Sequence, residues 1–451
     1  MKPEIENWKS KLVVALVPTA SFCIPFTVYC PPATSLLMKR LLSVASALSL
    51  ASFSIMSCAS SEMTEDDIIA QATELHQRLL TIDTHDDIPP NFATEEVDPG
   101  SPGGRQVTLP QMRDGGLDVA FFIVYVGQTE RTEENYAKAK EDALVKFAAI
   151  HRMADTLYPA EIEVAYSAAD VTRIHETGKL VAAIGIENGY AIGKDLSLLE
   201  RYYQLGARYI TLAHGGHNDI ADSSTPRDHL DDGPEEHGGI SGFGEEVIAE
   251  MNRLGIMVGV SHISKNAMLD AARLSQAPVI ASHSSARALA DHPRNMDDEQ
   301  LLALKANGGV MQTVAFDSYV KVPHPEKVAA QRQLREDLGL PPRGFSTLTP
   351  EQREAVIQGL AEIDEEWPGA TVSDFVDHID YAVDLIGIDH VGISSDFDGG
   401  GGVEGWDNAA ETLNVTIELV RRGYTEDEIV KLWSGNVLRV WLEVERVAEE
   451  M

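Results

Sequence analysis

The chain has 451 residues, of which 44% are hydrophobic, and this length suits one large domain or two smaller ones. Acidic residues outnumber Lys and Arg by 71 to 36, which gives a formal net charge of −35 and a pI near 4.6. A charge of this sign excludes nucleic acids and anionic lipid surfaces as partners, because both would be repelled.

All cysteines of the chain lie before the expected folded domain, at Cys23, Cys30 and Cys58. This position excludes both a disulfide framework and a thiolate metal site within that domain. Any metal in the domain must therefore be held by His, Asp and Glu.

Residues 38–58 have the pattern of an export signal. Met38-Lys39-Arg40 is a short positive region, an apolar run follows over 41–56, and the run ends at Ser57-Cys58. This resembles a bacterial lipoprotein signal, and it predicts an exported protein of the cell envelope or periplasm, attached to the membrane only through a lipid on Cys58. The alternative is a secretory signal that is cleaved without lipidation, and it also predicts export.

Residues 1–37 are interpreted as a mis-assigned or unstructured extension, with the true start at Met38. The apolar stretch over 12–37 is a poor membrane helix because prolines interrupt it, at Pro18, Pro25, Pro31 and Pro32.

From residue 65 onward, short β-rich runs alternate with longer segments of helical periodicity, as expected for βα units around a parallel sheet. The expected strands are 79–84, 119–126, 180–186, 208–213, 256–261, 278–282, 309–315 and 390–395. The expected helices include 134–156, 243–254, 297–306, 373–386 and 426–447. Eight such units predict a closed α/β barrel, a (β/α)₈ TIM-like fold over residues 65–447. An open doubly wound sheet is the alternative, although no Gly-rich dinucleotide turn follows the first strand.

One connection, residues 317–370, is longer than a usual βα loop and is rich in charged residues and Pro. A helical pattern near 350–365 lies within it. We interpret this segment as an insertion over the barrel mouth that could act as a lid.

Polar residues stand at the ends of six expected strands. In a parallel barrel all strand C-termini open on one face, so these side chains should converge there, and that face carries the active site. Each His taken alone is explained more simply as a core or surface residue, and it is the joint pattern that indicates a site. The six residues are His85, Glu187, His214, His262, His283 and Asp396.

The same residues have the chemistry of a metal centre. His85 and Asp87 lie two apart, so an extended chain points both to one side, where they can grip the same ion. Glu187 follows an apolar run, where an isolated carboxylate would cost several kcal/mol and bridging two cations would remove that cost. With imidazoles from His262 and His283 and no thiolate, zinc is the expected metal, with manganese or cobalt as alternatives.

Two aspartates follow the last expected strand. We favour Asp396 over Asp398 as the functional residue because it is nearer the strand end, whereas Asp398 can as easily serve the turn at 399–402.

Taken together, several stretches resemble the membrane dipeptidase, or renal dipeptidase, family of the metal-dependent amidohydrolases, over about residues 66–445. The stretches are Asp83-Thr84-His85-Asp86-Asp87, Gly185-Ile186-Glu187-Asn188-Gly189, Thr211-Leu212-Ala213-His214, Ser261-His262-Ile263-Ser264, Ser282-His283-Ser284-Ser285-Ala286, Pro293-Arg294-Asn295 and Ser395-Asp396-Phe397-Asp398-Gly399.

The resemblance implies a homodimer that hydrolyses dipeptides, with some tolerance of a C-terminal D-residue. It implies two zinc ions per subunit, with His85 and Asp87 on one, His262 and His283 on the other, and Glu187 bridging them. It also implies that Asp396 receives the proton of the bridging water and that His214 faces the tetrahedral intermediate. By the same resemblance, Arg294 pairs with the substrate carboxylate with help from Tyr319.

Two other functions compete with this one. The first is hydrolysis of lactones or phosphotriesters, or deamination, on the same barrel. Sites for those reactions usually begin with a His-x-His motif and have a bridging Lys. This chain has His85-x-Asp87 and Glu187 at those places instead. A non-enzymatic, exported lipoprotein that binds metal or peptide is the second alternative, since a fold does not guarantee activity.

Overall fold

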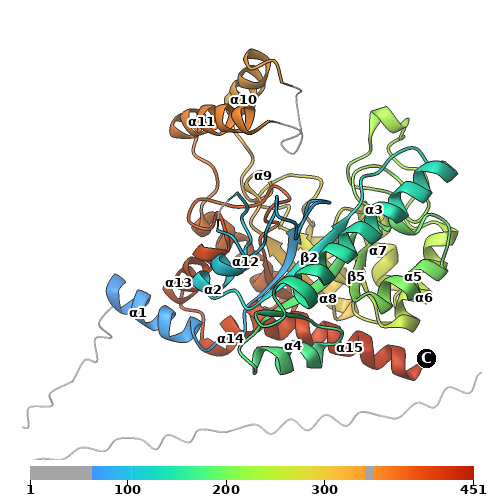
Figure 1. Ribbon diagram of the computed structural model, residues 1–451, viewed down its shortest axis with the longest axis horizontal. Helices are drawn as coiled ribbons and strands as arrows, with labels where there is room; N and C mark the ends of the chain where they lie inside the picture. The colour runs from blue at the N-terminus through green and yellow to red at the C-terminus, as the bar shows by residue number, and fades with distance from the viewer. Residues whose placement is uncertain (1–62, 103, 341–348) are drawn as a thin grey trace, which may run out of the picture. The chain divides into compact units, whose positions relative to one another are not determined.

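One parallel sheet runs through the part of the chain that the computed structural model describes, residues 63–102, 104–340 and 349–451 (Figure 1). Each strand on its main path matches one of the eight expected strands, with bounds that differ by three residues or fewer. In order around the sheet the strands are β1 (Ile82–Asp87), β2 (Val119–Tyr125), β4 (Leu180–Glu187), β5 (Ala207–Thr211), β6 (Met257–Gly259), β7 (Ile280–Ser284), β8 (Val310–Val314) and β9 (Val391–Ser394).

The two ends of this path, β1 and β9, meet and nearly close the sheet into a barrel. Asp86 forms a parallel bridge with Phe397, and the Asp87 N–H donates to the Phe397 carbonyl at 2.9 Å. The Ser395 N–H donates to Asp83 Oδ1 at 3.0 Å. The expected TIM-like barrel is confirmed, and the open doubly wound alternative is wrong.

An additional strand, β3 (Ile162–Val164), was not expected from the sequence. It pairs with the first residues of β4, Leu180 to Ala182, whereas β5 pairs with β4 only from Ile184 onward. The strand therefore extends the sheet where β5 has not yet begun. With three residues, it is too short for its periodicity to be recognised.

Helices connect the strands and cover the outside of the barrel (Figure 1). They are α1 (Glu65–His76), α2 (Leu109–Gly115), α3 (Glu133–His151), α4 (Ala168–His175), α5 (Ser197–Gln204), α6 (Gly242–Leu254), α7 (Lys265–Leu274), α8 (Asp298–Asn307), α9 (Asp317–Val320), α10 (Pro325–Asp337), α11 (Pro350–Glu366), α12 (Val372–Ile386), α13 (Leu413–Arg421), α14 (Glu426–Val430) and α15 (Asn436–Glu450). Several start at capping boxes, such as Thr371 with Asp374, in which side chains satisfy the first free N–H groups. In the described part of the chain, no helix has the length and apolar character needed to span a bilayer.

The N-terminal end of the barrel is filled by the last helix, α15. Its residues Val437, Val440 and Trp441 are buried in one cluster with inward-facing strand residues such as Phe121 and Tyr209. The rings of Phe121 and Trp441 lie 5.6 Å apart. The larger remaining core lies between the strands and the surrounding helices. The barrel interior is therefore packed at one end, and only the opposite end is available for a site.

Replacing Trp441 with alanine should lower the free energy of unfolding by about 3–5 kcal/mol, because a large cavity would open under the barrel. Its neighbour Leu442 is 52% exposed, so Leu442→Ala is the matched control and should change stability by less than about 0.5 kcal/mol. Urea denaturation of both variants checks this. Equal losses in the two variants would contradict the packing of α15.

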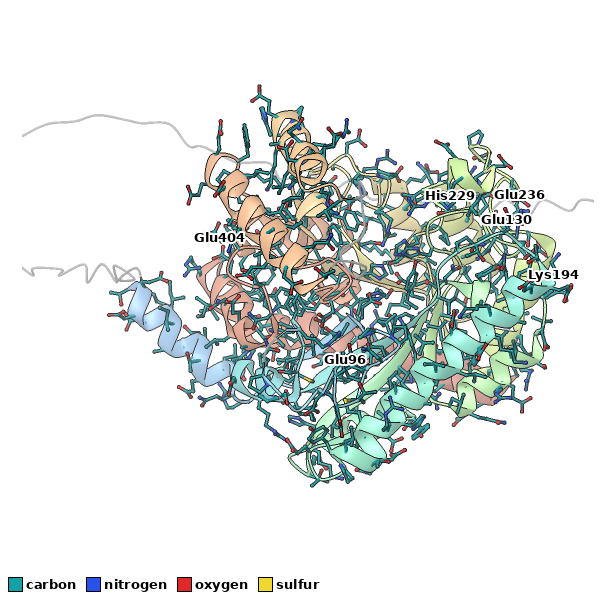
Figure 2. All side chains as sticks on the ribbon, turned by 45° about the horizontal axis from the view of Figure 1, so that its top comes forward. Glu96, Glu130, Lys194, His229, Glu236 and Glu404 are labelled. Carbon is teal, nitrogen blue, oxygen red and sulfur yellow. The ribbon has the colours of Figure 1, made fainter. Side chains whose placement is uncertain are left out.

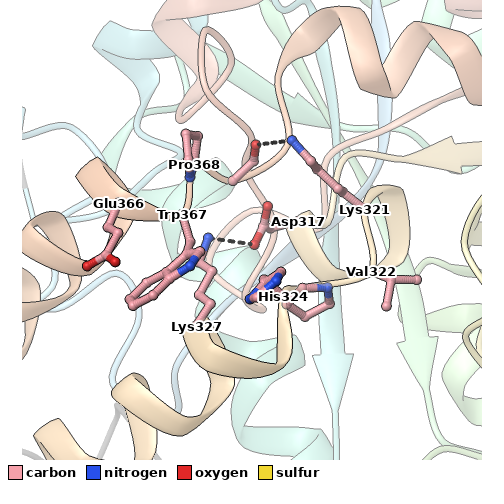
Figure 3. A pocket seen from close by; sticks show the side chains of 10 residues that line it. Asp317, Lys321, Val322, His324, Lys327, Glu366, Trp367 and Pro368 are labelled. Atoms are coloured by element: carbon pink, nitrogen blue, oxygen red, sulfur yellow. Dashed lines mark hydrogen bonds and ion pairs between the residues drawn. The ribbon is translucent and has the colours of Figure 1, made fainter.

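The long connection after β8 forms α9 and then two helices, α10 and α11, which lie side by side and stand out from the barrel (Figure 1). The helical piece expected near 350–365 is present as α11. At the base of these helices, buried Lys327 pairs with Asp364 at 3.0 Å and with Asp317 at 3.7 Å. A cavity of about 290 Å³ lies there, with His324 and Trp367 among its lining residues (Figure 3). A role as a lid stays a prediction.

The predicted extension over 1–37 and the predicted signal over 38–58, with Cys58, lie outside the described residues.

Candidate active site

The six strand-end residues expected to form a site do converge at the C-terminal end of the barrel. His85 and Asp87 lie in β1, Glu187 ends β4, and His283 lies in β7. His214, His262 and Asp396 stand two or three residues beyond β5, β6 and β9.

Glu187 is the centre of this arrangement. Its carboxylate is almost fully buried, and four imidazoles direct their Nε2 atoms at the single oxygen Oε1. The distances to Oε1 are 2.8 Å from His262, 3.3 Å from His283, 3.6 Å from His85 and 3.8 Å from His214. Asp87 Oδ2 also lies 3.6 Å from His85 Nε2.

These donors fit metal ions. The Nε2 atoms of His262 and His283 are only 2.7 Å apart, and the buried His85 Nε2 has no hydrogen-bond partner among the described residues. Buried imidazole nitrogens that crowd one carboxylate without satisfied bonds are costly unless a cation lies between them. The ligand atoms fall into three overlapping groups, each within 4.8 Å: His85, Glu187 and His283; Glu187, His214 and His262; His85, Asp87 and Asp396.

This grouping differs from the one that the resemblance implies, because His283 groups with His85, and His214 joins His262. His214 was expected to face the reaction intermediate, and here its ring also packs against the ring of His262 with centres 4.1 Å apart. His214 Nε2 is therefore placed where it can contact either an ion or a substrate held by the ions.

Burial dominates the electrostatics of the site. It raises the pKa of Asp396 well above its ordinary value, with Asp87 and Glu187 adding to the effect against His85 and Arg294. Burial also lowers the pKa of His262 and His283 well below the usual range, helped by the Arg294 cation. Both imidazoles are thus kept neutral, which is the form that binds metal.

Glu187 behaves in the opposite way. Burial alone would raise its pKa, but His214, His85 and His262 outweigh burial, and the pKa lies well below the ordinary value. The carboxylate is therefore held in its charged form at the meeting point of the imidazoles. A charged carboxylate at the meeting point of several imidazoles is a suitable bridge between two cations.

Comparison with known proteins identifies the family of the chain. Residues 69–451 match the family model described as membrane dipeptidase, peptidase family M19. The chain belongs to this family. It is 32% identical over 351 residues to the dipeptidase aclJ of Aspergillus oryzae, covering 77% of this chain and 72% of that protein. It is 33% identical over 347 residues to the dipeptidase tcpJ of Claviceps purpurea, covering 76% and 70%.

Among solved structures, the probable dipeptidase PvdM from Pseudomonas aeruginosa is similar with a TM-score of 0.75 and 35% identity, covering 85% of this chain and all of that one. The chain is accordingly a dipeptidase of the M19 metallopeptidases, and the resemblance stated from its motifs is confirmed. The non-enzymatic alternative is wrong.

In this dipeptidase the orientation of the His85 ring is fixed by a hydrogen bond between its Nδ1 atom and Tyr209 of β5. The Tyr209 hydroxyl donates to the Thr84 carbonyl at 2.9 Å, so it must accept the 2.9 Å bond from His85 Nδ1. The Nδ1 atom therefore carries a proton, and Nε2 is the nitrogen left to bind a metal ion. Such outer partners typically tune metal affinity.

Replacing Tyr209 with phenylalanine should weaken metal binding by about 10- to 100-fold, because His85 would lose the acceptor that fixes its tautomer. Tyr202→Phe is the matched control, since the buried Tyr202 hydroxyl donates to the Ala191 carbonyl at 2.9 Å, away from the centre. Competition with a metal chelator measures both variants. Equal metal affinity in the two variants would contradict this role for Tyr209.

The backbone at the strand ends is strained. Asn188, His262 and Asp396 have positive φ angles of 82°, 71° and 60°, which are uncommon for residues other than glycine. The His262 carbonyl accepts from the Ser224 N–H at 2.7 Å, and the Asp396 carbonyl accepts from the Gly401 N–H at 2.8 Å. Strain of this kind persists where surrounding bonds hold it, and it often accompanies functional sites.

The expected substrate-binding residues lie beside the centre. Arg294 is buried, its Nη2 donates to the His283 carbonyl at 3.0 Å, and its Nε has no partner among the described residues. Its guanidinium lies 5.4 Å from the centre of the Tyr319 ring. Asp398, in contrast, pairs with Arg105 at 2.8 Å and accepts from the Gln106 and Val107 N–H groups. The structure thus places Asp396, and not Asp398, with His85 and Asp87.

Sequence reasoning missed two tyrosines of the site, Tyr125 and Tyr209. Both stand in the middle or at the end of apolar strands, where nothing in the local pattern separates them from core residues. A buried tyrosine hydroxyl needs a hydrogen-bond partner, and this was the available signal. Tyr125 ends β2 in register with Glu187, and its ring centre is 4.8 Å from that of His214.

Proposed function

We propose that this dipeptidase holds two zinc ions per chain and hydrolyses dipeptides, including some with a C-terminal D-residue. The observation that supports this most strongly is the convergence of four imidazoles on the Glu187 carboxylate, with Asp87 and Asp396 adjacent. Neutral imidazole and carboxylate ligands without thiolate suit zinc. His85 and Asp87 would hold one ion and His262 and His283 the other, with Glu187 between them. When bound, such a pair lowers the pKa of a shared water toward about 7 and polarises a carbonyl.

The protein's own residues do the rest of the chemistry. Asp396, whose pKa burial raises, takes up a proton from the attacking water and releases it to the departing amine. His214 lies beside Glu187 and supports the oxygen on which negative charge develops. Breaking the peptide bond then yields two free amino acids.

Arg294 supplies the anchor for the substrate. Its planar, buried guanidinium with an unused Nε can grip a peptide's terminal carboxylate through paired hydrogen bonds. The Tyr319 ring, 5.4 Å away, supports that orientation. A free C-terminus close to the scissile bond is what separates a dipeptide from a longer chain, so this anchor favours dipeptides.

The direct test is metal analysis of the full purified chain together with a panel of dipeptides. We expect about two zinc ions per chain, release of free amino acids, loss of release after chelation and recovery on adding zinc. Recovery with manganese or cobalt but not with zinc would contradict the zinc assignment. Turnover of lactones or phosphotriesters without amino-acid release would contradict the substrate.

We also propose that the chain is exported, carries lipid on Cys58 and forms a homodimer. The support for export and lipidation is the residue pattern over 38–58. Mass spectrometry of the mature protein should find an N-terminus at Cys58 with added acyl mass, and retention of residues 38–57 would contradict export through this signal. Light scattering tests the dimer.

A further inference from the structure

Arg227 lies on the segment between β5 and α6, and hydrogen bonds to its backbone N–H and carbonyl fix its position. Asp232 Oδ2 accepts from the Arg227 N–H at 2.8 Å and from the His217 N–H at 3.0 Å. The Arg227 carbonyl accepts from the Leu230 N–H at 2.9 Å. His229 and Glu236, labelled in Figure 2, mark this segment, and an ion pair between Glu236 and Arg131 joins it to the loop that follows β2.

The guanidinium of Arg227 lies directly on Gly215, the residue after His214. A Cβ atom at Gly215 would come within 2.3 Å of Arg227 Nη2 and 2.6 Å of its Nε. The absence of a side chain at Gly215 thus leaves room for the cation beside His214.

This cation has no partner of its own. Among the described residues, no carboxylate or carbonyl is within hydrogen-bond or ion-pair distance of the Arg227 guanidinium, whereas Arg131 on the same side of the barrel pairs with Glu236 at 2.7 Å. Acidic residues outnumber basic ones by 71 to 36. An arginine left unpaired in such a chain, next to His214, is free to bind an anion from outside.

Tyr125 and Lys146 lie next to this position. Arg227 acts on the Tyr125 hydroxyl and on His214 as a nearby positive charge. Lys146 of α3 is 6% exposed, its Nζ lies 5.4 Å from the centre of the Tyr125 ring, and it too forms no ion pair with a described residue. Lys146 thus lies against the Tyr125 ring, and the positive charge of Arg227 acts on the hydroxyl of the same residue.

The order of the strands fixes which end of a substrate meets this position. Arg294 and Tyr319 follow β7 and β8, and across the ring from them Tyr125 ends β2, with Glu187 on the adjacent β4. A dipeptide anchored at Arg294 by its carboxylate and crossing Glu187 brings its N-terminal residue toward Tyr125 and Arg227.

We propose that Arg227, with the Tyr125 hydroxyl, forms a side-chain subsite that selects dipeptides with an acidic N-terminal residue. The inference rests on the proposed function, because it takes Arg294 as the anchor of the substrate carboxylate.

The test compares kcat/KM for L-Glu-L-Ala and L-Gln-L-Ala, two dipeptides of nearly equal shape that differ in charge. The zinc-loaded protein should prefer the glutamyl peptide by about tenfold or more, as expected for a charge-assisted pair. In Arg227→Gln this ratio should fall close to one, and Arg227→Lys, which keeps the charge, should retain part of it.

Arg131→Gln is the matched control, because it removes one positive charge from the same side of the barrel and should leave the ratio at the wild-type value. A wild-type kcat/KM ratio of one or less would overturn the subsite, and so would an unchanged ratio in Arg227→Gln. In either case, hydrolysis of L-Gln-L-Ala would leave the proposed function standing. Hydrolysis of neither peptide by the zinc-loaded protein would overturn the proposed function and the subsite together.

Discussion

Replacing Glu187 with alanine should abolish metal binding and dipeptide hydrolysis together. Its Oε1 lies within 3.8 Å of four imidazole Nε2 atoms, so one substitution removes the carboxylate on which all four converge. The four imidazoles would then face one another without a central negative charge, and cations would be held by too few ligands. We expect bound metal to fall close to zero and turnover to fall by at least about 1,000-fold.

Elemental analysis and amino-acid release, measured on the same preparation, check this prediction. Glu445→Ala is the matched control. Glu445 lies on α15, at the other end of the barrel, and its side chain accepts from the Ala168 N–H at 3.1 Å. That variant should keep its metal and its turnover. A Glu187→Ala protein with the wild-type metal content would contradict the bridging role.

Replacing Asp396 with alanine should have a different signature, with metal retained and turnover lowered by at least about 100-fold. Asp396 belongs to only one of the three ligand groups, the one with His85 and Asp87, so most of the ligand set survives its loss. The buried carboxyl, with its raised pKa, is the group able to carry a proton from water to the leaving amine, and alanine cannot do so.

Asp398→Asn is the control for this variant. Asp398 stands two residues further on, and its side chain pairs with Arg105 and accepts from the Gln106 and Val107 N–H groups. Its loss should therefore change turnover by only a few-fold. Full activity in Asp396→Ala would refute the proton-transfer role. Loss of metal in proportion to activity would make Asp396 a ligand instead.

The barrel was predictable because its strands are short apolar runs separated by amphipathic helices. Residues such as Glu187 and His283 come at the end of apolar runs that must be buried. Because all strands of a closed barrel are parallel, the side chains at their C-terminal ends lie on one shared face. The same logic separated Asp396 from Asp398. The three-residue strand β3 was not predictable, because so short a segment has no measurable period.

The surroundings of the centre were harder to predict than the position of its histidines and carboxylates. Tyr125 and Tyr209 look like core residues in the sequence, and only the three-dimensional register brings Tyr125 beside Glu187 and Tyr209 beside His85. Arg227 lies in a long polar segment with many charges, and its position depends on the close approach to Gly215. The substrate-binding role of Arg294 was suggested by the family resemblance and not by its local pattern.

Anomalous diffraction from crystals of the zinc-loaded protein, recorded at the zinc edge, tests the central claim most directly. The proposal predicts two peaks, one on each side of the Glu187 carboxylate, at about 2.0–2.2 Å from their ligand atoms. One peak should lie near His85 and Asp87, and the other near His262 and His283. A single peak, or peaks away from Glu187, would contradict the two-zinc centre.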